Sequence, residues 1–159
     1  GFRVGWMCLS GDKSKAKGYI DALNMLSSMR LCANVPGQSI IQTALGGQQS
    51  LDALLVPGGR IYEQREFIFD TLNSIDGLSA EKPDAAFYIF PRIDTKKFNI
   101  TNDEKFALDL LRQEHILVVH GGGFNWKKPD HFRIVYLPNT HDLEIVANRL
   151  ESFLANYKQ

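Results

Sequence analysis

The sequence lacks the features that mark secreted, membrane-bound or metal-binding proteins. It has only two cysteines, Cys8 and Cys32, too few for a disulfide scaffold, and no Cys or His spacing typical of a zinc site. No apolar run approaches the roughly 20 residues that a membrane-spanning helix needs. Free cysteines of this kind are usually buried and reduced. We therefore expect a soluble, cytoplasmic protein without a metal site.

An excess of charge of one sign is also missing. Eighteen Lys and Arg residues balance eighteen Asp and Glu residues, so the formal net charge at pH 7 is zero. Proteins that bind nucleic acid or an anionic membrane usually carry an excess of basic residues. We therefore expect neither nucleic acid nor a membrane as a partner.

What the sequence does contain is enough apolar material for a folded core. It has 159 residues, of which 44% are hydrophobic. Hydrophobic periodicity, capping residues and breakers predict the following elements in order. They are a strand over 2–9, a helix that Asp12 caps, a helix from Pro36 to Gly46, a helix over 60–75, a strand over 85–93, a helix that Thr101 opens, strands over 116–120 and 132–137, and a final helix that Thr140 caps.

This element order predicts an α/β chain whose second half is a small two-layer α/β domain. The best boundary is Pro57-Gly58-Gly59, because three consecutive breakers separate two periodic segments. We therefore predict a first part over residues 1–58, and a hinge helix with the small domain over residues 59–159.

A glycine run follows the strand predicted over residues 116–120. Gly121, Gly122 and Gly123 lie between His120 and Phe124, as in the oxyanion-hole motif of lipases and esterases. Those enzymes also need a Gly-x-Ser-x-Gly further along the chain, and this sequence has none. The alternative is structural, since glycines let the chain turn tightly after a strand.

Three arginines are candidates for binding an anion. Arg3 lies between glycines at the start of an apolar segment, which suits a phosphate. Arg133 lies in the middle of a predicted strand, where an unpaired charge is costly to bury. It is either an exposed arginine at a sheet edge or, if its face lines a cleft, a bidentate ligand for a carboxylate. Arg30 is by default a solvated charge at a helix end.

Taken together, these segments resemble the C-terminal part of the fold-type I, pyridoxal-phosphate-dependent aminotransferases, most closely the alanine aminotransferase branch. The family's motifs are matched, in the family's order, by Gly1–Trp6, by Met29–Cys32 with Val35–Gln38, by Pro83–Tyr88, by Gly121–Phe124 and by His131–Ile134. The resemblance covers essentially the whole chain. One departure is Ala85, which stands where the family usually has glycine.

The resemblance implies roles for particular residues. Arg3 would bind the phosphate of pyridoxal phosphate, and Arg133 would bind the α-carboxylate of the substrate. Arg30 and Asn34 would lie near the active site of the partner subunit in a homodimer, and Phe87 would contact substrate. The first part of the chain would be the end of the large cofactor domain, followed by the small domain.

The resemblance also implies an activity, the transfer of an amino group between an amino acid and a 2-oxo acid. Alanine with pyruvate and glutamate with 2-oxoglutarate are the expected pairs. In the family the Schiff-base lysine stands eight residues before the arginine that Arg3 matches, so it is expected before residue 1. Lys15 follows a serine, but the residue eight positions later is Leu23, so Lys15 does not fit this pattern. This chain is then a fragment with no catalytic residue of its own and inactive alone. The alternative is a non-catalytic α/β binding or interaction module.

Overall fold

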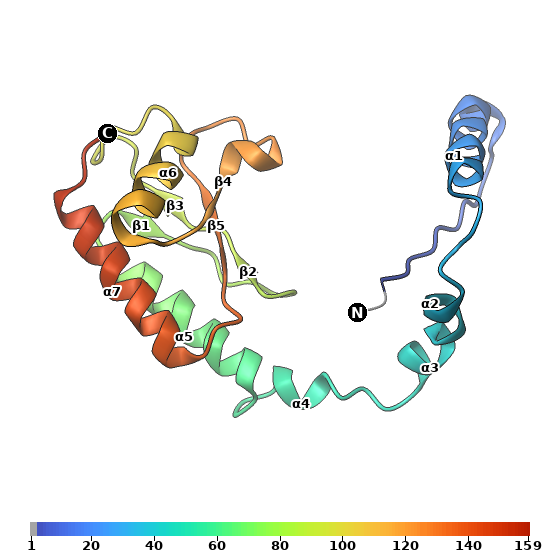
Figure 1. Cartoon of the computed structure of the whole chain (residues 1–159), viewed down its shortest axis with the longest axis horizontal. Coiled ribbons are helices and arrows are strands. Elements are labelled where there is room, and N and C mark those ends of the chain that lie inside the picture. Colours follow the sequence, from blue (N-terminus) through green and yellow to red (C-terminus); the bar gives the residue numbers. More distant parts are fainter. Residues whose placement is uncertain (1–2) are drawn as a thin grey trace. The chain divides into compact units, whose positions relative to one another are not determined.

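The computed structural model describes residues 3–159 and divides the chain into two compact units, Gly1–Ser50 and Leu51–Gln159 (Figure 1). Each unit is described by itself. No helix within the described residues is long and apolar enough to cross a membrane. The assignment of residues 51–58 to the large domain stays a prediction.

The first unit consists of short helices joined by irregular segments. They are the 3-10 turn η1 (Ser14–Ala16), α1 (Lys17–Arg30), α2 (Val35–Ser39) and α3 (Ile41–Gly46). Asp12 accepts a hydrogen bond from the backbone N–H of Ser14 at 2.9 Å, which fixes the turn before α1. The helix predicted from Pro36 to Gly46 is divided in two at Ile40.

The strand predicted over residues 2–9 is wrong for the residues that the structure describes. Residues 3–9 form no strand, and Phe2, like Gly1 of the Gly1–Trp6 motif, lies outside the described residues. The reason is that a strand needs a neighbouring strand for its hydrogen bonds, and no described residue pairs with this segment. Hydrophobic alternation alone does not supply that partner.

The apolar stripe that predicts α1 is present, but it is exposed within this unit. Tyr19, Leu26 and Met29 are 60%, 63% and 75% exposed, and α1 has no buried residue. In a globular protein such a stripe normally faces a core.

The second unit carries the remaining elements. Its helices are α4 (Asp52–Leu55), α5 (Arg60–Ser74), α6 (Asp103–Glu114) and α7 (Thr140–Asn156), and its 3-10 turn is η2 (Gly121–Phe124). Its strands are β1 (Leu78–Ser79), β2 (Tyr88–Ile89), β3 (Arg92–Ile93), β4 (Val119–His120) and β5 (Phe132–Val135). In the described residues β1 pairs with β3, while β5 lies between β2 and β4, and every pairing is antiparallel.

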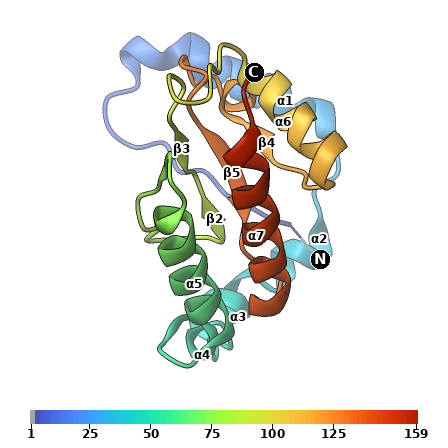
Figure 2. The ribbon, with the colours of Figure 1, turned by 90° about the vertical axis from the view of Figure 1, so that its left-hand side faces the viewer.

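The second unit has a layer of helices over one face of these strands. Figures 1 and 2 show α5 and α7 side by side, and in Figure 2 the strands lie behind them. The core between the layers includes Ile68 and Leu72 of α5, Phe106 and Leu110 of α6, Leu143 and Leu150 of α7, and Ile89, Phe132 and Ile134 of the strands. This half of the chain is thus the mixed α/β unit that the sequence predicts.

Several predicted boundaries move, each for a local reason. The strand predicted over 85–93 is split into β2 and β3 on either side of Phe90 and Pro91, because proline has no N–H for a ladder. Asn102, not Thr101, caps α6 by accepting the N–H of Lys105 at 2.9 Å.

The final helix is capped in the same way, by the residue before the predicted threonine. Asn139, not Thr140, accepts the N–H of Asp142 at 2.9 Å. Asparagine is at least as good an N-cap as threonine, so in both helices the preceding asparagine takes the position. The strands predicted over 116–120 and 132–137 are shortened to β4 and β5.

Candidate functional site

Strand β5 places Arg133 on the face of the sheet opposite the helices. Its neighbours Phe132 and Ile134 are buried in the core, and side chains alternate along a strand. Arg133 is therefore half-buried on the outer face of the central strand, opposite Val119 of β4. Of the two alternatives that the sequence leaves open for Arg133, the exposed arginine at a sheet edge is therefore wrong.

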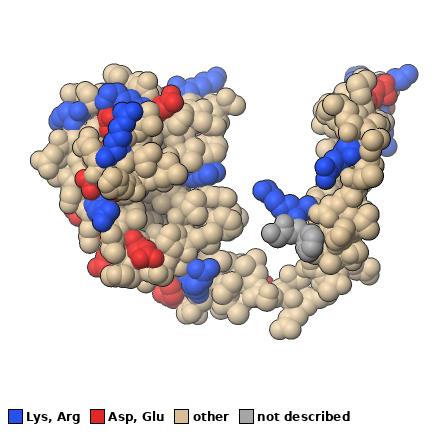
Figure 3. Space-filling model, in the orientation of Figure 1, with Lys and Arg blue, Asp and Glu red and all other residues tan. Residues whose placement is uncertain are grey.

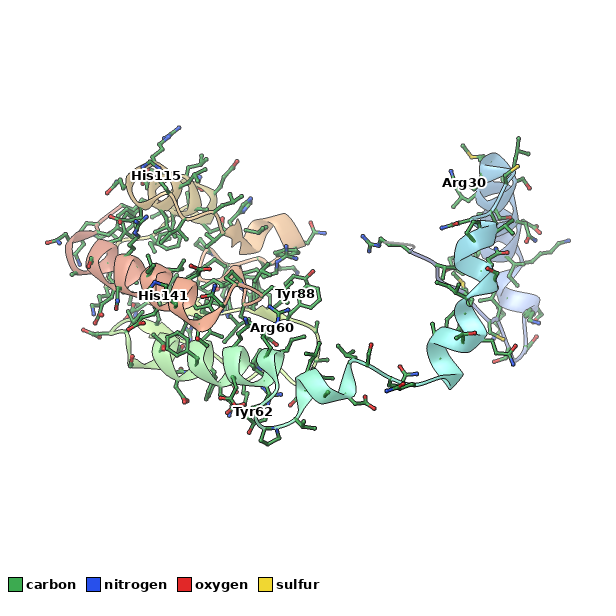
Figure 4. All side chains as sticks on the ribbon, turned by 60° about the horizontal axis from the view of Figure 1, so that its bottom comes forward. Arg30, Arg60, Tyr62, Tyr88, His115 and His141 are labelled. Atoms are coloured by element: carbon green, nitrogen blue, oxygen red, sulfur yellow. The ribbon has the colours of Figure 1, made fainter. Side chains whose placement is uncertain are left out.

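The Arg133 guanidinium is held between two aromatic rings. Its Cζ lies 4.5 Å from the centre of the Tyr88 ring and 4.7 Å from the centre of the Phe124 ring. Tyr88 comes from β2 and stands at the surface of the second unit (Figure 4), while Phe124 closes η2. Cation–π contact with both rings stabilises the charge and restricts the rotation of the guanidinium.

The positive charge of Arg133 has no anionic partner in the described part of the chain. None of the ion pairs between described residues includes Arg133. Its Nε atom is buried and has no hydrogen-bond partner among residues 3–159. A buried donor on a charged group is costly when it is left unpaired. The arrangement therefore suits an incoming planar anion such as a carboxylate.

The glycine turn η2 brings Phe124 to this place. The N–H of Gly121 donates to the backbone oxygen of His131 at 2.8 Å, which ties the turn to the chain just before β5. A Cβ atom at Gly121 would lie 2.9 Å from that same oxygen, so the position has no room for a side chain. The structural interpretation of the glycine run, a tight turn after a strand, is confirmed.

A buried carboxylate supports the chain at the start of β5. Asp130 is 7% exposed and accepts hydrogen bonds from Trp126 Nε1 at 2.8 Å and from His131 Nδ1 at 2.7 Å. Burial raises the pKa of Asp130, but these hydrogen bonds outweigh it and leave the pKa below its usual value. The His131 ring stacks on Phe90, with centroids 4.9 Å apart. Next to Arg133, the outer face of the sheet thus carries aromatic side chains that hydrogen bonds and ring contacts hold in place.

The other residues predicted for the site lie elsewhere. Arg3, Arg30 and Asn34 belong to the first unit. Arg3 is exposed; Arg30 is exposed in the last turn of α1 (Figure 4). Asn34 caps α2 by accepting the N–H of Gly37 at 3.2 Å. Phe87, in the second unit, packs against the hydrophobic core.

Sequence reasoning missed the two rings that hold Arg133. In the sequence Tyr88 and Phe124 stand out only as parts of motifs, since no spacing relates them to Arg133. One signal was available, the alternation of β5, which predicts that Arg133 and the buried Phe132 lie on opposite faces.

The rest of the visible surface of this unit carries both signs of charge without a single-sign patch (Figure 3).

The fold and the site together define a class: a mixed α/β unit whose small antiparallel sheet presents an arginine that has no ionic partner among residues 3–159 and is suited to a carboxylate. Comparison with known proteins is more specific. The profile of the family described as Aminotransferase class I and II matches residues 1–150. The chain therefore belongs to the class I and II aminotransferases, as its motifs predicted. This family uses pyridoxal phosphate.

Curated relatives narrow the comparison. The chain is 58% identical over all 159 residues to the glutamate-pyruvate aminotransferase AlaA of Haemophilus influenzae and spans 39% of that protein. It is 48% identical over its whole length to an alanine aminotransferase of Mycobacterium bovis, of which it spans 37%. The chain thus covers well under half the length of these relatives.

Solved structures give the same picture. A crystal structure of an aminotransferase from Escherichia coli matches with a TM-score of 0.86 and 54% identity, over 94% of this chain and 37% of that one. Alanine aminotransferase from Pyrococcus furiosus matches with a TM-score of 0.73 and 38% identity, over 90% of this chain and 35% of that one. The described residues thus have the fold of part of an aminotransferase.

Proposed function

We propose that this chain is the C-terminal part of a pyridoxal-phosphate-dependent aminotransferase that moves an amino group between alanine or glutamate and pyruvate or 2-oxoglutarate. The names of the relatives, glutamate-pyruvate aminotransferase and alanine aminotransferase, support this pair of substrates. The identity of 58% over the whole chain supports a shared reaction. The proposal concerns the whole enzyme, since the chain spans 39% of that relative.

Arg133 is the residue that binds the α-carboxylate of the substrate in this proposal. The observation that carries it is the Arg133 guanidinium, whose Cζ lies 4.5 Å and 4.7 Å from the ring centres of Tyr88 and Phe124 and whose Nε is buried without a hydrogen-bond partner among the described residues. A carboxylate can meet the fork of a guanidinium with two parallel hydrogen bonds. The two rings fix the plane of that fork before substrate arrives, which lowers the entropic cost of binding.

Arg3 is the residue that this chain offers to the cofactor. It is exposed and forms no hydrogen bond or ion pair with the described residues, so its guanidinium is available to a phosphate. Bound pyridoxal phosphate accepts the amino group and acts as an electron sink for the substrate. The lysine that bonds the cofactor lies outside this chain in our proposal, so the chain alone is catalytically inactive.

The whole enzyme is a homodimer in this proposal, and the first unit contributes to the contact. The exposed apolar residues of α1 and of the segment after it include Leu26, Met29 and Leu31, at 63%, 75% and 89% exposure. Such a surface is typical of one that another part of the enzyme covers. Arg30 and Asn34 would lie near the partner's active site, and Phe87 would contact the substrate.

The test is one conservative substitution in the full-length enzyme. Arg133→Lys keeps the charge but loses the fork and the stacking geometry. We expect kcat/KM for alanine to fall by about 100-fold, equivalent to roughly 3 kcal/mol. Arg112→Lys, at an exposed position of α6, is the matched control and should change nothing. A loss below tenfold would exclude Arg133 as the carboxylate ligand.

A further inference from the structure

The carboxylate of Asp103 connects α6 to the glycine turn. Asp103 lies in the first turn of α6, and its Oδ2 accepts the backbone N–H of Gly122 at 2.6 Å. The same oxygen lies 3.5 Å from His120 Nδ1, which has no hydrogen bond with a described residue. Nothing in the role of Arg133 as a carboxylate ligand accounts for this contact.

The turn that Asp103 holds has little freedom of its own. Besides the bond from Gly121 to His131, the N–H of Asn125 donates to the oxygen of Gly122 at 3.0 Å, and that of Trp126 donates to the oxygen of Gly121 at 3.2 Å. A Cβ atom at Gly122 would lie 3.1 Å from His120 Nδ1 and 3.3 Å from the Asp103 carboxylate. The turn is therefore fixed on one side to the start of β5 and on the other to α6.

Phe124 is the last residue of this turn, and its ring centre is 4.7 Å from the Arg133 guanidinium. One residue, Gly123, separates it from Gly122, the residue that Asp103 holds. A shift of Gly122 therefore moves Phe124 relative to Arg133. Asp103 is thus linked to the guanidinium by one hydrogen bond, a constrained turn and one ring contact.

We propose that Asp103 is a positioning residue, which holds the glycine turn so that Phe124 covers Arg133 and fixes the plane in which the guanidinium meets a carboxylate. The proposal rests on the proposed function of Arg133. What position 103 requires is a side-chain oxygen that accepts the N–H of Gly122, and a negative charge is not needed. Asparagine at position 103 therefore retains the effect, because its side-chain oxygen can accept the same N–H.

The experiment compares variants of the full-length enzyme with two substrates. L-alanine has the carboxylate, and L-alaninamide replaces it with a neutral amide. Asp103→Ala should raise KM for alanine by about three- to tenfold, the range expected when a cation–π contact is weakened. It should leave kcat nearly unchanged and should not raise KM for alaninamide. Hydrogen exchange of residues 120–126 should become faster in the same variant.

Two controls separate positioning from general damage. Asp103→Asn should restore the wild-type KM and exchange rates. Glu104→Ala removes the neighbouring, exposed carboxylate of the same helical turn and should change neither. Should Asp103→Ala fail to fold, Phe124→Leu leaves the bond from Gly122 intact and should give the same selective rise in KM for alanine.

The proposal is overturned if exchange of the turn becomes faster while KM for alanine stays at its wild-type value. It is equally overturned if KM rises alike for alanine and alaninamide, or if Phe124→Leu has no selective effect. Failure of the proposed function looks different, since Arg133→Lys would then retain wild-type kcat/KM for alanine. If Arg133→Lys strongly lowers kcat/KM for alanine but Asp103→Ala leaves KM for alanine unchanged, only the positioning role of Asp103 is excluded.

Discussion

The hydroxyl of Tyr136 donates a hydrogen bond to the backbone oxygen of Ala86 across 3.0 Å. Ala86 has a φ of 61°, in the left-handed region that residues with a side chain rarely adopt. The backbone N–H of Tyr136 also donates to the oxygen of Phe87 at 3.1 Å. Tyr136 thus holds the bend through which the chain enters β2 and places Tyr88 against Arg133.

Removing the Tyr136 hydroxyl should therefore destabilise the second unit. We expect Tyr136→Phe to lower the free energy of unfolding by about 1–2 kcal/mol, because the buried ring stays but its hydrogen bond is lost. Urea unfolding of the chain measures the change. Tyr62→Phe, whose hydroxyl has no hydrogen bond in the described part of the chain, should be neutral. Equal effects of the two substitutions would refute this account.

The glycine turn offers a second matched pair of substitutions. Gly121→Ala places a Cβ atom 2.9 Å from the backbone oxygen of His131, so either the turn or β5 must shift. We expect a loss of about 1–3 kcal/mol, as for other overpacked positions. At Gly123 the nearest atom to a Cβ is Val119 Cγ1 at 3.4 Å, an ordinary contact. Gly123→Ala should therefore lower the free energy of unfolding much less than Gly121→Ala does. If urea unfolding shows the larger loss for Gly123→Ala, the close approach of Gly121 to the His131 oxygen is contradicted.

Tyr157 should make stability depend on alkaline pH. Burial and the hydrogen bond to Asp109, 2.9 Å long, raise the pKa of Tyr157 to about 12. The unfolded chain releases this proton near pH 10, so the stabilisation is complete below pH 10 and declines as the pH rises toward 12. We expect wild type to lose up to about 2–3 kcal/mol relative to Tyr157→Phe over that interval. A stability difference that stays constant from pH 9 to 12 would show that Tyr157 titrates normally.

Arg3 should matter for cofactor retention in the full-length enzyme and not for the stability of the fold. Arg3→Ala removes a charged hydrogen-bond donor worth about 1.5–3 kcal/mol to a phosphate. The dissociation constant of pyridoxal phosphate should rise by roughly ten- to hundredfold, measured by dialysis and absorbance. Lys13→Ala, at another exposed basic residue of the first unit, is the control. If the Arg3→Ala variant retains pyridoxal phosphate as well as the wild type does, Arg3 is an ordinary surface arginine that does not bind the phosphate.

The elements of the second unit could be predicted because their signals are local. Leu143, Leu150 and Leu154 recur at helical spacing and are buried on one face of α7. Strand Phe132–Val135 has the alternation that its sequence shows. The strand predicted over residues 2–9 could not be judged in this way, since a strand depends on a partner strand that the segment does not itself encode.

The site was predictable only in part, for a related reason. That Arg133 is a candidate follows from a charge in an apolar strand. Its surroundings come from Tyr88 and Phe124, which lie on either side of it in space but 45 residues before and nine residues before it in sequence. The contact from Asp103 to Gly122 likewise bridges a separation of 19 residues. No local pattern specifies such pairs.

The measurement that tests the central claim most directly is the preference of the full-length enzyme for a carboxylate. It is the ratio of kcat/KM for L-alanine to that for L-alaninamide, in wild type and in Arg133→Ala. Only alanine has the group that Arg133 binds, so the account predicts that the substitution lowers this ratio by about 100-fold or more. If both substrates lose activity equally and the ratio stays at its wild-type value, Arg133 does not bind the substrate carboxylate.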